Sequence, residues 1–569
     1  MNIYRFAIAD DAANGNPSKF LPSEAEQRFS TSTWLLKISS VELTRYAPHK
    51  SGSHRSGSCR HRASIDRMLS MEQLSLIVKD HLELIRITNQ EKHSHKWTIK
   101  HSDMGGRGLF TTEDIKAGEV LFVDHPLVYG PRSGTNIQIG CTVCGKTDSD
   151  PLFQCTKCGL LLCSRQCQNS NSHYDDCIVI SGWTNKVPIE NMNDTLISRC
   201  LTPIRALSLN EDQQQLLNAL QAHTQPQHGS EIRELQEYFE VSAEEAQLLK
   251  LAVCILDANA FQIAVPYGRK VMSMRGLYPV SSLMNHNCMP NTKYSFNEEY
   301  HMTIKAVKSI SAGTELTTCY TGLLWGTPAR RLHLFKTKHF WCKCERCADP
   351  TERGTFLAAL KCFEPSCSSS LLPVESLNPM SAWRCLSCGL RVPNNNICTI
   401  QSALGSLIGS LNFENIAELE IFYLNRVFKY IPKTNQIVVD LQCKIIWEFG
   451  ETDGFRWHEL SDSRLALKES LCRGILITVA ALGLGDAHLR GLLLYHLHAT
   501  LAERARRCPE LYEDLKTEIE NTIEQAYNIL QGDISSPPDL ELRRKYIGPG
   551  SDKPFQERFI LDTTGSKNY

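Results

Sequence analysis

The chain has 569 residues, of which 42% are hydrophobic and 22% charged, a composition typical of a globular protein with about three or four domains. Its formal net charge of −1 argues against strong, self-sufficient nucleic-acid binding. The most apolar run, Gly474–Leu484, is too short to span a bilayer, so we expect no membrane segment.

The first 95 residues are predicted to be a disordered or weakly structured extension (1–95). The segment Tyr46–Arg62 contains almost nothing apolar and so cannot build a core. Within the extension, Leu74–Ile87 has the pattern of a short amphipathic helix.

Strand-like segments begin at Trp97–Lys100 and Val120–Val123. A helical region over roughly 190–262 follows, in which Ser242 and Glu245 form a capping box. Strands and turns return over Gly276–Tyr320. Beyond residue 400 we expect successive packed helices, for which the clearest patterns are Ser463–Leu482, Ala487–Ala505 and Pro509–Leu530.

The 23 cysteines cluster in close-spaced pairs, and no signal peptide opens the chain. Such pairs indicate metal ligands in a reducing compartment, the cytoplasm and/or the nucleus. The densest block supplies eight ligands, enough for two tetrahedral zinc ions: Cys141, Cys144, Cys155, Cys158, Cys163, Cys167, His173 and Cys177. The alternative is a set of unrelated free cysteines. Because the block has few aliphatic residues, metal must replace a core there.

Four further motifs stand in a fixed order along the chain. They are Gly106-Arg107-Gly108-Leu109, Asn285-His286-Asn287-Cys288-Met289-Pro290-Asn291, Gly313-Thr314-Glu315-Leu316 with Tyr320 after it, and Cys342-x-Cys344-x2-Cys347. Each is weak alone, but the set resembles a SET domain with its post-SET tail. The eight-ligand block between the first two motifs resembles a MYND finger, so the chain resembles the SET and MYND domain family of protein lysine methyltransferases.

The resemblance implies an α+β fold: a SET-domain β-fold with an inserted MYND zinc finger and a helical insert, a post-SET zinc site, and an all-α, TPR-like C-terminal domain. A zinc ribbon-like insertion points to the arthropod-expanded branch of the family. We therefore assign the N-terminal part of SET to residues 96–135, the finger to 141–177, the helical insert to 185–275 and the catalytic core to 276–325. The post-SET site is assigned to residues 335–350, the ribbon to 355–392 and the C-terminal domain to 400–545.

The resemblance also implies S-adenosylmethionine as cofactor and Tyr320 as the catalytic residue. Methyl transfer to a neutral amine depends on placing the two reactants in near-attack geometry, which a tyrosine hydroxyl can help to hold. The implied cofactor-binding residues are Gly106, Arg107, Asn259, Ser282, Asn285, His286, Tyr320 and Phe340. Alternatives remain for three of them: Tyr320 as a core tyrosine, His286 with a purely structural ring, and Asn259 as the last residue of a helix. Tyr278 and Phe340 are candidate walls of a lysine channel.

The implied zinc sets are four. In the finger, Cys141, Cys144, Cys163 and Cys167 hold one ion, and Cys155, Cys158, His173 and Cys177 hold the other. Cys288 joins Cys342, Cys344 and Cys347 in the post-SET site. The spacing Cys362-x4-Cys367 with Cys385-x2-Cys388 indicates a further ion in the ribbon, against the alternative of unliganded surface cysteines.

Three functions are compatible with the sequence. The first is a lysine methyltransferase acting on a histone or non-histone protein in transcriptional regulation, whose finger binds proline-containing peptides of partner proteins. The second is a catalytically inactive adaptor that recruits corepressor partners, and the third a nucleic-acid-binding zinc protein, which the charge disfavours. We expect a monomer with a protein or peptide lysine as substrate.

Overall fold

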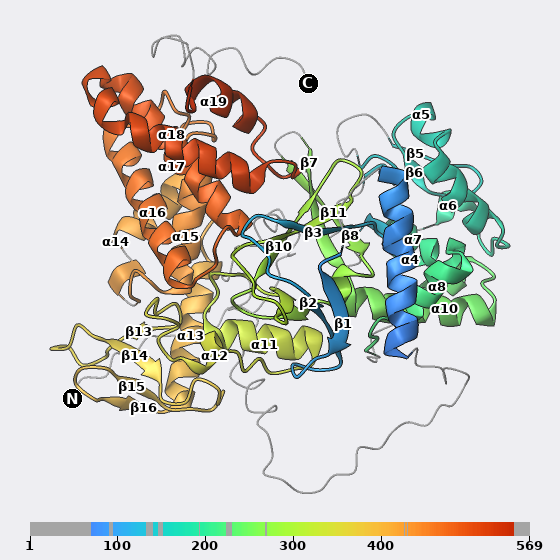
Figure 1. Ribbon diagram of the computed structural model, residues 1–569, viewed down its shortest axis with the longest axis horizontal. Helices are drawn as coiled ribbons and strands as arrows, with labels where there is room; N and C mark the ends of the chain where they lie inside the picture. The colour runs from blue at the N-terminus through green and yellow to red at the C-terminus, as the bar shows by residue number, and fades with distance from the viewer. Residues whose placement is uncertain are drawn as a thin grey trace, which may run out of the picture.

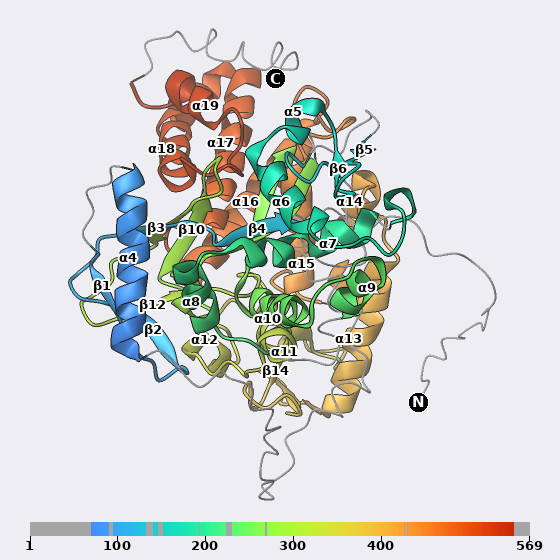
Figure 2. The ribbon, with the colours of Figure 1, turned by 90° about the vertical axis from the view of Figure 1, so that its right-hand side faces the viewer.

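The computed structural model describes residues 70–89, 95–131, 140–145, 152–192, 194–223, 230–267, 270–425, 427–429 and 431–550. Small sheets occupy the middle of the molecule (Figures 1 and 2). The teal and green finger and helical insert lie on one side of them, and the orange and red C-terminal helices lie on the other (Figure 1). No helix in the described ranges has the length and apolar character that crossing a membrane requires.

One four-stranded sheet joins segments that are far apart in the sequence. Its strand order is β1-β2-β12-β9, with bounds Trp97–His101, Arg107–Thr111, Glu315–Thr318 and Asn285–His286. The hairpin β1–β2 is antiparallel, β12 pairs antiparallel with β2, and β9 pairs parallel with β12. This topology brings together the motifs that begin at Gly106, Asn285 and Gly313, which are spread over about two hundred residues of sequence.

Two further sheets complete the central fold. One has the order β10-β11-β3, with bounds Thr292–Phe296, Met302–Ala306 and Val120–Asp124. The other has the order β4-β8-β7, with bounds Val128–Pro131, Lys270–Leu277 and Phe261–Tyr267. The sheets share one core, to which the four-stranded sheet contributes Leu109 and Leu316 and the sheet β10-β11-β3 contributes Phe122 and Ile304.

The N-terminal extension is not weakly structured throughout, as 1–95 was expected to be. Helix α4, Met71–Asn89, is longer than predicted and packs against β1, β3 and α8. Leu74, Val78 and Leu82 recur at helical spacing on its buried face and join the central core. The short amphipathic helix predicted over Leu74–Ile87 is therefore present, and because the stripe is too short to fold alone, it depends on packing against the central core. Residues 1–69 of the prediction lie outside the described residues.

Leu82→Ala is therefore expected to weaken the docking of α4 by about 2–4 kcal/mol, because it leaves a cavity in a packed site. Amide hydrogen exchange in α4 should accelerate by about two orders of magnitude. Leu84→Ala is the matched control, since Leu84 is 65% exposed. Unchanged exchange in the Leu82 variant would mean that α4 is not held by this stripe.

The finger is a short hairpin followed by two helices. Strands β5, Phe153–Gln154, and β6, Leu161–Leu162, are antiparallel. Helices α5, Arg165–Gln168, and α6, Asn171–Ser181, follow with Ser164 and Ser170 as their N-caps. Arg205 in α7 donates to both carboxylate oxygens of Asp176 in α6, at 2.9 and 2.7 Å, and so fixes the finger to the insert.

The helical insert is shorter than the predicted 185–275. Its helices α7, α8, α9 and α10 span Asp194–Arg205, Glu211–Ala219, Ser230–Tyr238 and Ala243–Asn259. The expected capping box of Ser242 and Glu245 opens α10. After Asn259 the chain forms β7 and β8, because aromatic and β-branched residues there complete a sheet on β4. These residues and the pairing of β7 with β8 and of β8 with β4 end the helical insert at Asn259.

Two more helices come after the central strands: α11, Thr327–Lys338, and α12, Glu345–Ala348. The ribbon and the C-terminal helices come after α12 in the sequence. The ribbon is an antiparallel sheet of β13, β14, β15 and β16: Leu360–Lys361, Ser370–Pro373, Trp383–Cys385 and Arg391–Val392. The C-terminal helices α13 to α19 are Asn394–Gly409, Ile416–Asn425, Gln436–Glu448, Asp462–Ala481, His488–Arg507, Tyr512–Leu530 and Leu540–Ile547. They confirm the predicted helical C-terminus, which begins slightly before residue 400.

The C-terminal helices are attached directly to the central sheets. The amide of Asp486 donates to the carbonyl of Val307 at 2.9 Å, and that of Ile534 donates to Phe296 at 2.8 Å. Lys293 in β10 donates to the carbonyl of Ile529 at 2.9 Å. The C-terminal helices therefore lie directly beside the central strands (Figure 1).

Candidate active site and zinc sites

Asn285 is at the centre of the predicted cofactor site. Its side-chain NH2 donates to the carbonyl of Arg107 at 2.9 Å and to Glu315 Oε1 at 2.7 Å. Its Oδ1 accepts no hydrogen bond within the described part of the chain. An amide oxygen that is fixed in place in this way can accept from an ammonium group of a ligand.

Glu315 orients Asn285, a role that sequence reasoning did not assign to it. Its second oxygen accepts from the Ser102 hydroxyl at 2.9 Å. A Cβ at position 108 would approach Glu315 Oε1 to 2.2 Å, so the glycine there makes room for this carboxylate. Gly106 has φ +67°, a conformation that favours glycine.

Arg107 contacts the last residue of α8, and Asn259 contacts the segment just after that helix. Arg107 donates to the carbonyl of Ala219, and Asn259 Nδ2 donates to the carbonyl of Gln221 at 2.7 Å. Asn259 also donates to the carbonyl of Ile255 at 2.8 Å, as expected for the last residue of α10. Ser282 Oγ donates to the carbonyl of Tyr278 at 2.6 Å and lies 3.4 Å from the carbonyl of Asn259.

His286 has a buried ring whose two nitrogens are both engaged. Nδ1 accepts from the backbone N–H of Tyr320 at 3.0 Å, and Nε2 lies 3.2 Å from Cys288 Sγ. Burial lowers the pKa of His286 to about 3, so the ring is neutral. The geometry matches the alternative in which this ring is structural, because it links the backbone of Tyr320 to Cys288.

Tyr320 donates its hydroxyl to the carbonyl of Met284 at 2.6 Å. Burial raises the pKa of this hydroxyl, so it stays protonated near neutral pH. The centroid of the Phe340 ring lies 6.0 Å from that of the His286 ring. Phe340 and Tyr320 pack against the same buried cluster of side chains. Tyr278, in contrast, is fully buried and donates to the carbonyl of Tyr300 at 2.6 Å, so it does not line a channel.

Lys338 is a charged neighbour of Tyr320 that the sequence did not reveal. Its ammonium lies 5.8 Å from the centroid of the Tyr320 ring. It also donates to the carbonyls of Ala258 at 2.6 Å and Asp257 at 3.1 Å, near the end of α10. Lys338 thus joins the end of α11 to the helix that carries Asn259.

The sixteen predicted zinc ligands fall into four groups in the structure. In each group the ligand atoms lie within 4.8 Å of one another: Cys141, Cys144, Cys163 and Cys167; Cys155, Cys158, His173 and Cys177; Cys288, Cys342, Cys344 and Cys347; Cys362, Cys367, Cys385 and Cys388. Thiolate and imidazole donors at such spacing suit tetrahedral zinc with no open position. These groups could each hold one ion.

His173 is set up as a ligand by its second nitrogen. Its Nδ1 lies 2.7 Å from the carbonyl of Gln168, while Nε2 lies 3.5 Å from Cys158 Sγ. A proton on Nδ1 leaves the Nε2 lone pair for metal. Because His173 and Cys177 are four residues apart in α6, both point to the same face of that helix.

A buried ionic network lies beside the group formed by Cys288, Cys342, Cys344 and Cys347. Arg330 donates from Nε to Cys288 Sγ at 3.2 Å and from Nη2 to Cys347 Sγ at 3.4 Å. Glu352 Oε2 accepts from Arg330 at 2.6 Å and from Arg346 at 3.2 Å. All three side chains are at most 1% exposed. Sequence reasoning missed this network, although an arginine inside Cys344-x2-Cys347 was a possible signal.

Comparison with known proteins places this geometry in a family. A SET domain model matches residues 106–321. The "SET domain-containing protein SmydA-8, isoform B" of Drosophila melanogaster is 30% identical over 436 residues, which cover 74% of this chain and 94% of that protein. The Mus musculus "Histone-lysine N-methyltransferase SMYD3" is 26% identical over 305 residues, 49% of this chain and 67% of that protein.

A structural comparison gives a weaker likeness. The crystal structure of the SET domain of LSMT bound to lysine and AdoHcy has a TM-score of 0.29 and 13% identity, covering 87% of this chain and 97% of that one.

Proposed function

Because this chain belongs to the SMYD family of SET-domain proteins, in its SmydA branch, we propose that it is an S-adenosylmethionine-dependent protein-lysine N-methyltransferase. The observation that carries the proposal is the sheet that joins Arg107, Asn285, Glu315 and the approach to Tyr320. Related proteins of mouse and human are histone-lysine N-methyltransferases.

The residues present fit this cofactor. S-adenosylmethionine, when bound, supplies an electrophilic methyl group. Asn285 Oδ1, held by Glu315 and the Arg107 carbonyl, would accept from the amino-acid end of the cofactor. Tyr320, with its backbone held by His286 and its hydroxyl still protonated, would orient the substrate amine. Gly106, Arg107, Asn259, Ser282 and Phe340 would complete the cofactor contacts.

We further propose four structural zinc ions, one in each cysteine group, and a finger that binds proline-containing peptides of transcriptional partners. Tyr174 and Ile178 support a peptide surface, because they are 64% and 53% exposed on α6. The substrate would be a histone or another protein, and the protein would act as a monomer in the cytoplasm and/or nucleus. No direct nucleic-acid contact is part of this proposal.

Calorimetry with S-adenosylmethionine and the zinc-loaded protein tests the cofactor site. We expect micromolar binding that weakens at least about tenfold in Asn285→Ala, because a charge-assisted hydrogen bond is lost. Asn297→Ala, in the turn between β10 and β11, is the matched control and should bind normally. If the unaltered protein shows no binding, the proposal fails and the inactive adaptor replaces it.

A further inference from the structure

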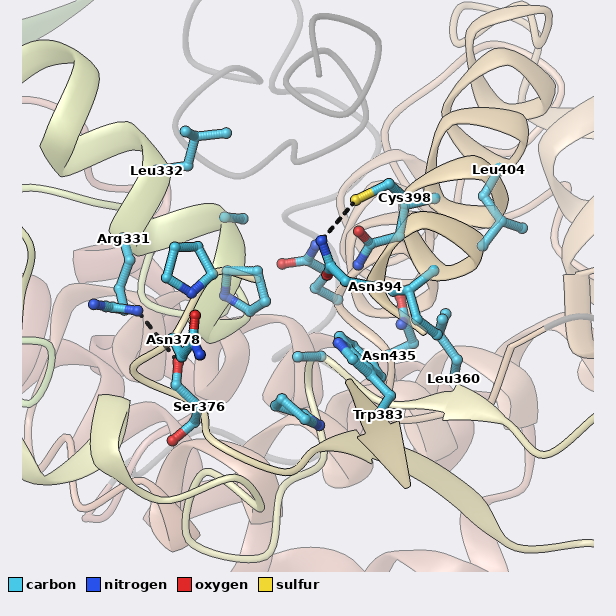
Figure 3. Close-up of a pocket in the computed structure, with 18 of the residues that line it drawn as sticks. Arg331, Leu332, Leu360, Ser376, Asn378, Trp383, Asn394, Cys398, Leu404 and Asn435 are labelled. Atoms are coloured by element: carbon cyan, nitrogen blue, oxygen red, sulfur yellow. Dashed lines mark hydrogen bonds between the residues drawn. The ribbon is translucent and has the colours of Figure 1, made fainter. Parts of the chain in front are cut away.

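A pocket lies outside the methyl-transfer site, where four parts of the chain meet. Its walls come from α11, the ribbon, α13 and the start of α15. Figure 3 shows Arg331 and Leu332 facing Asn394, Cys398 and Leu404 across the opening, with Leu360 and Trp383 below. The empty volume is about 960 Å³ when the open mouth and the solvent in it are included.

The ribbon completes this pocket. Leu360, Pro373 and Trp383 come from its strands, and Ser376, Asn378 and Pro379 come from the loop between β14 and β15. The loop is held at its start, since Ser376 Oγ donates to the carbonyl of Ala348 at 2.7 Å. Without the insertion, α11 and α13 would have no third wall between them.

The apolar part of the lining is firmly packed. Leu332, Leu360, Trp383, Ile397 and Ile437 are all at most 6% exposed, so the pocket is built from side chains that the core holds in place. Two residues of the bordering loop, Val374 and Leu377, are 43% and 37% exposed. An apolar wall with an apolar rim favours an occupant with a bulky hydrophobic group.

Arg331 is the only charged side chain among the described residues that line the pocket. It is 5% exposed, donates to the carbonyls of Cys342 at 3.0 Å and Ser376 at 3.3 Å, and stacks on Trp341 at 5.0 Å. The post-SET thiolates accept from Arg330 instead. Nη2 of Arg331 has no acceptor within the described ranges, so one edge of the guanidinium can still donate to a carboxylate.

Polar groups near the mouth of the pocket can also form further hydrogen bonds. The Asn394 amide donates only to sulfur acceptors, Cys398 at 3.5 Å and Met380 at 3.7 Å, which are weak. Gln401 is half-buried two turns further along α13 than Asn394. Paired donors and acceptors of this kind match the backbone of an extended peptide.

We propose that this ribbon-completed pocket binds a short peptide segment of a partner protein in which a bulky apolar side chain stands next to a carboxylate. The apolar group fills the space between Leu332, Trp383 and Ile397, and the carboxylate receives hydrogen bonds from Arg331. The binding is independent of methyl transfer. It gives the ribbon a role in recognition that the cofactor site does not require.

The test uses N-acetylated tripeptides, Gly-Leu-Leu, Gly-Leu-Phe and Gly-Leu-Trp, each as a free acid and as its C-terminal amide. Binding to the zinc-loaded full chain is measured by ligand-observed NMR and then by calorimetry. At least one free acid should bind at millimolar or lower concentration and about tenfold more tightly than its amide. Arg331→Met should remove the difference between acid and amide.

Two variants of α13 separate binding in the pocket from binding elsewhere. Gln401→Trp should block the mouth and abolish binding of acid and amide alike. Ala403→Trp, on an exposed position of the same helix outside the pocket, should leave binding intact. The proposal is overturned if no free acid binds, if acids and amides bind equally, or if the two tryptophan variants behave alike. Binding of S-adenosylmethionine, measured in parallel, keeps this outcome separate from that of the methyltransferase proposal.

Discussion

Replacing Glu352 by Gln is expected to lower the free energy of unfolding by about 3–5 kcal/mol, because it removes one partner from a buried ionic network. Glu352 is the acceptor shared by Arg330 and Arg346, and its other oxygen accepts from the backbone of Thr327 at 2.9 Å. The amide keeps the shape but leaves two buried guanidinium groups without their carboxylate.

The effect should extend to the post-SET zinc site. Four thiolates around one divalent ion carry a net negative charge, which Arg330 offsets through its bonds to Cys288 and Cys347. A displaced Arg330 would weaken metal retention. Urea unfolding and the rate of zinc release to a chelator measure the two effects.

Glu345→Gln is the matched control for this experiment. Its partner is Arg353, at 3.4 Å, and the two side chains are 77% and 44% exposed. An exposed pair of this kind contributes little, at most about 1 kcal/mol. Equal losses in the two variants would show that the buried network does not stabilise the fold.

Tyr320→Phe is expected to reduce methyl transfer by about a hundredfold or more while cofactor affinity changes little. The hydroxyl is held by the carbonyl of Met284 and the backbone by the ring of His286, so the group is fixed before substrate arrives. Without the hydroxyl, the substrate amine and the methyl group of the cofactor are no longer oriented by the same side chain.

A screen of histones and peptide arrays with labelled S-adenosylmethionine provides the rate measurement. Tyr294→Phe, on β10, removes a tyrosine hydroxyl elsewhere in the same domain and should keep full activity. Equal rates for Tyr320→Phe and the unaltered protein would exclude a catalytic role for this hydroxyl. A parallel fall in cofactor affinity would instead indicate a positioning defect in the whole site.

The groups of cysteines were accessible from sequence because metal ligands occur on tight turns, where spacing along the chain reports proximity in space. Cys141-x2-Cys144 is an example, and its two sulfurs lie with Cys163 and Cys167 in the structure. Cys288 needed the family resemblance, since no spacing connects it to Cys342 more than fifty residues later.

The sequence alone determined the order of the parts, the helical C-terminus and the residue types of the candidate site, because periodicity and short motifs are local properties of a chain. Tertiary structure alone decided the packing of α4, the pairing of β7 with β8 and of β8 with β4, and the neighbours of each site residue. Glu315 orients Asn285, Arg330 donates to the Cys288 sulfur, and the ribbon closes a pocket on α11 and α13. Each depends on contacts between residues that lie tens to hundreds of positions apart, and such contacts form only when burial brings whole elements together.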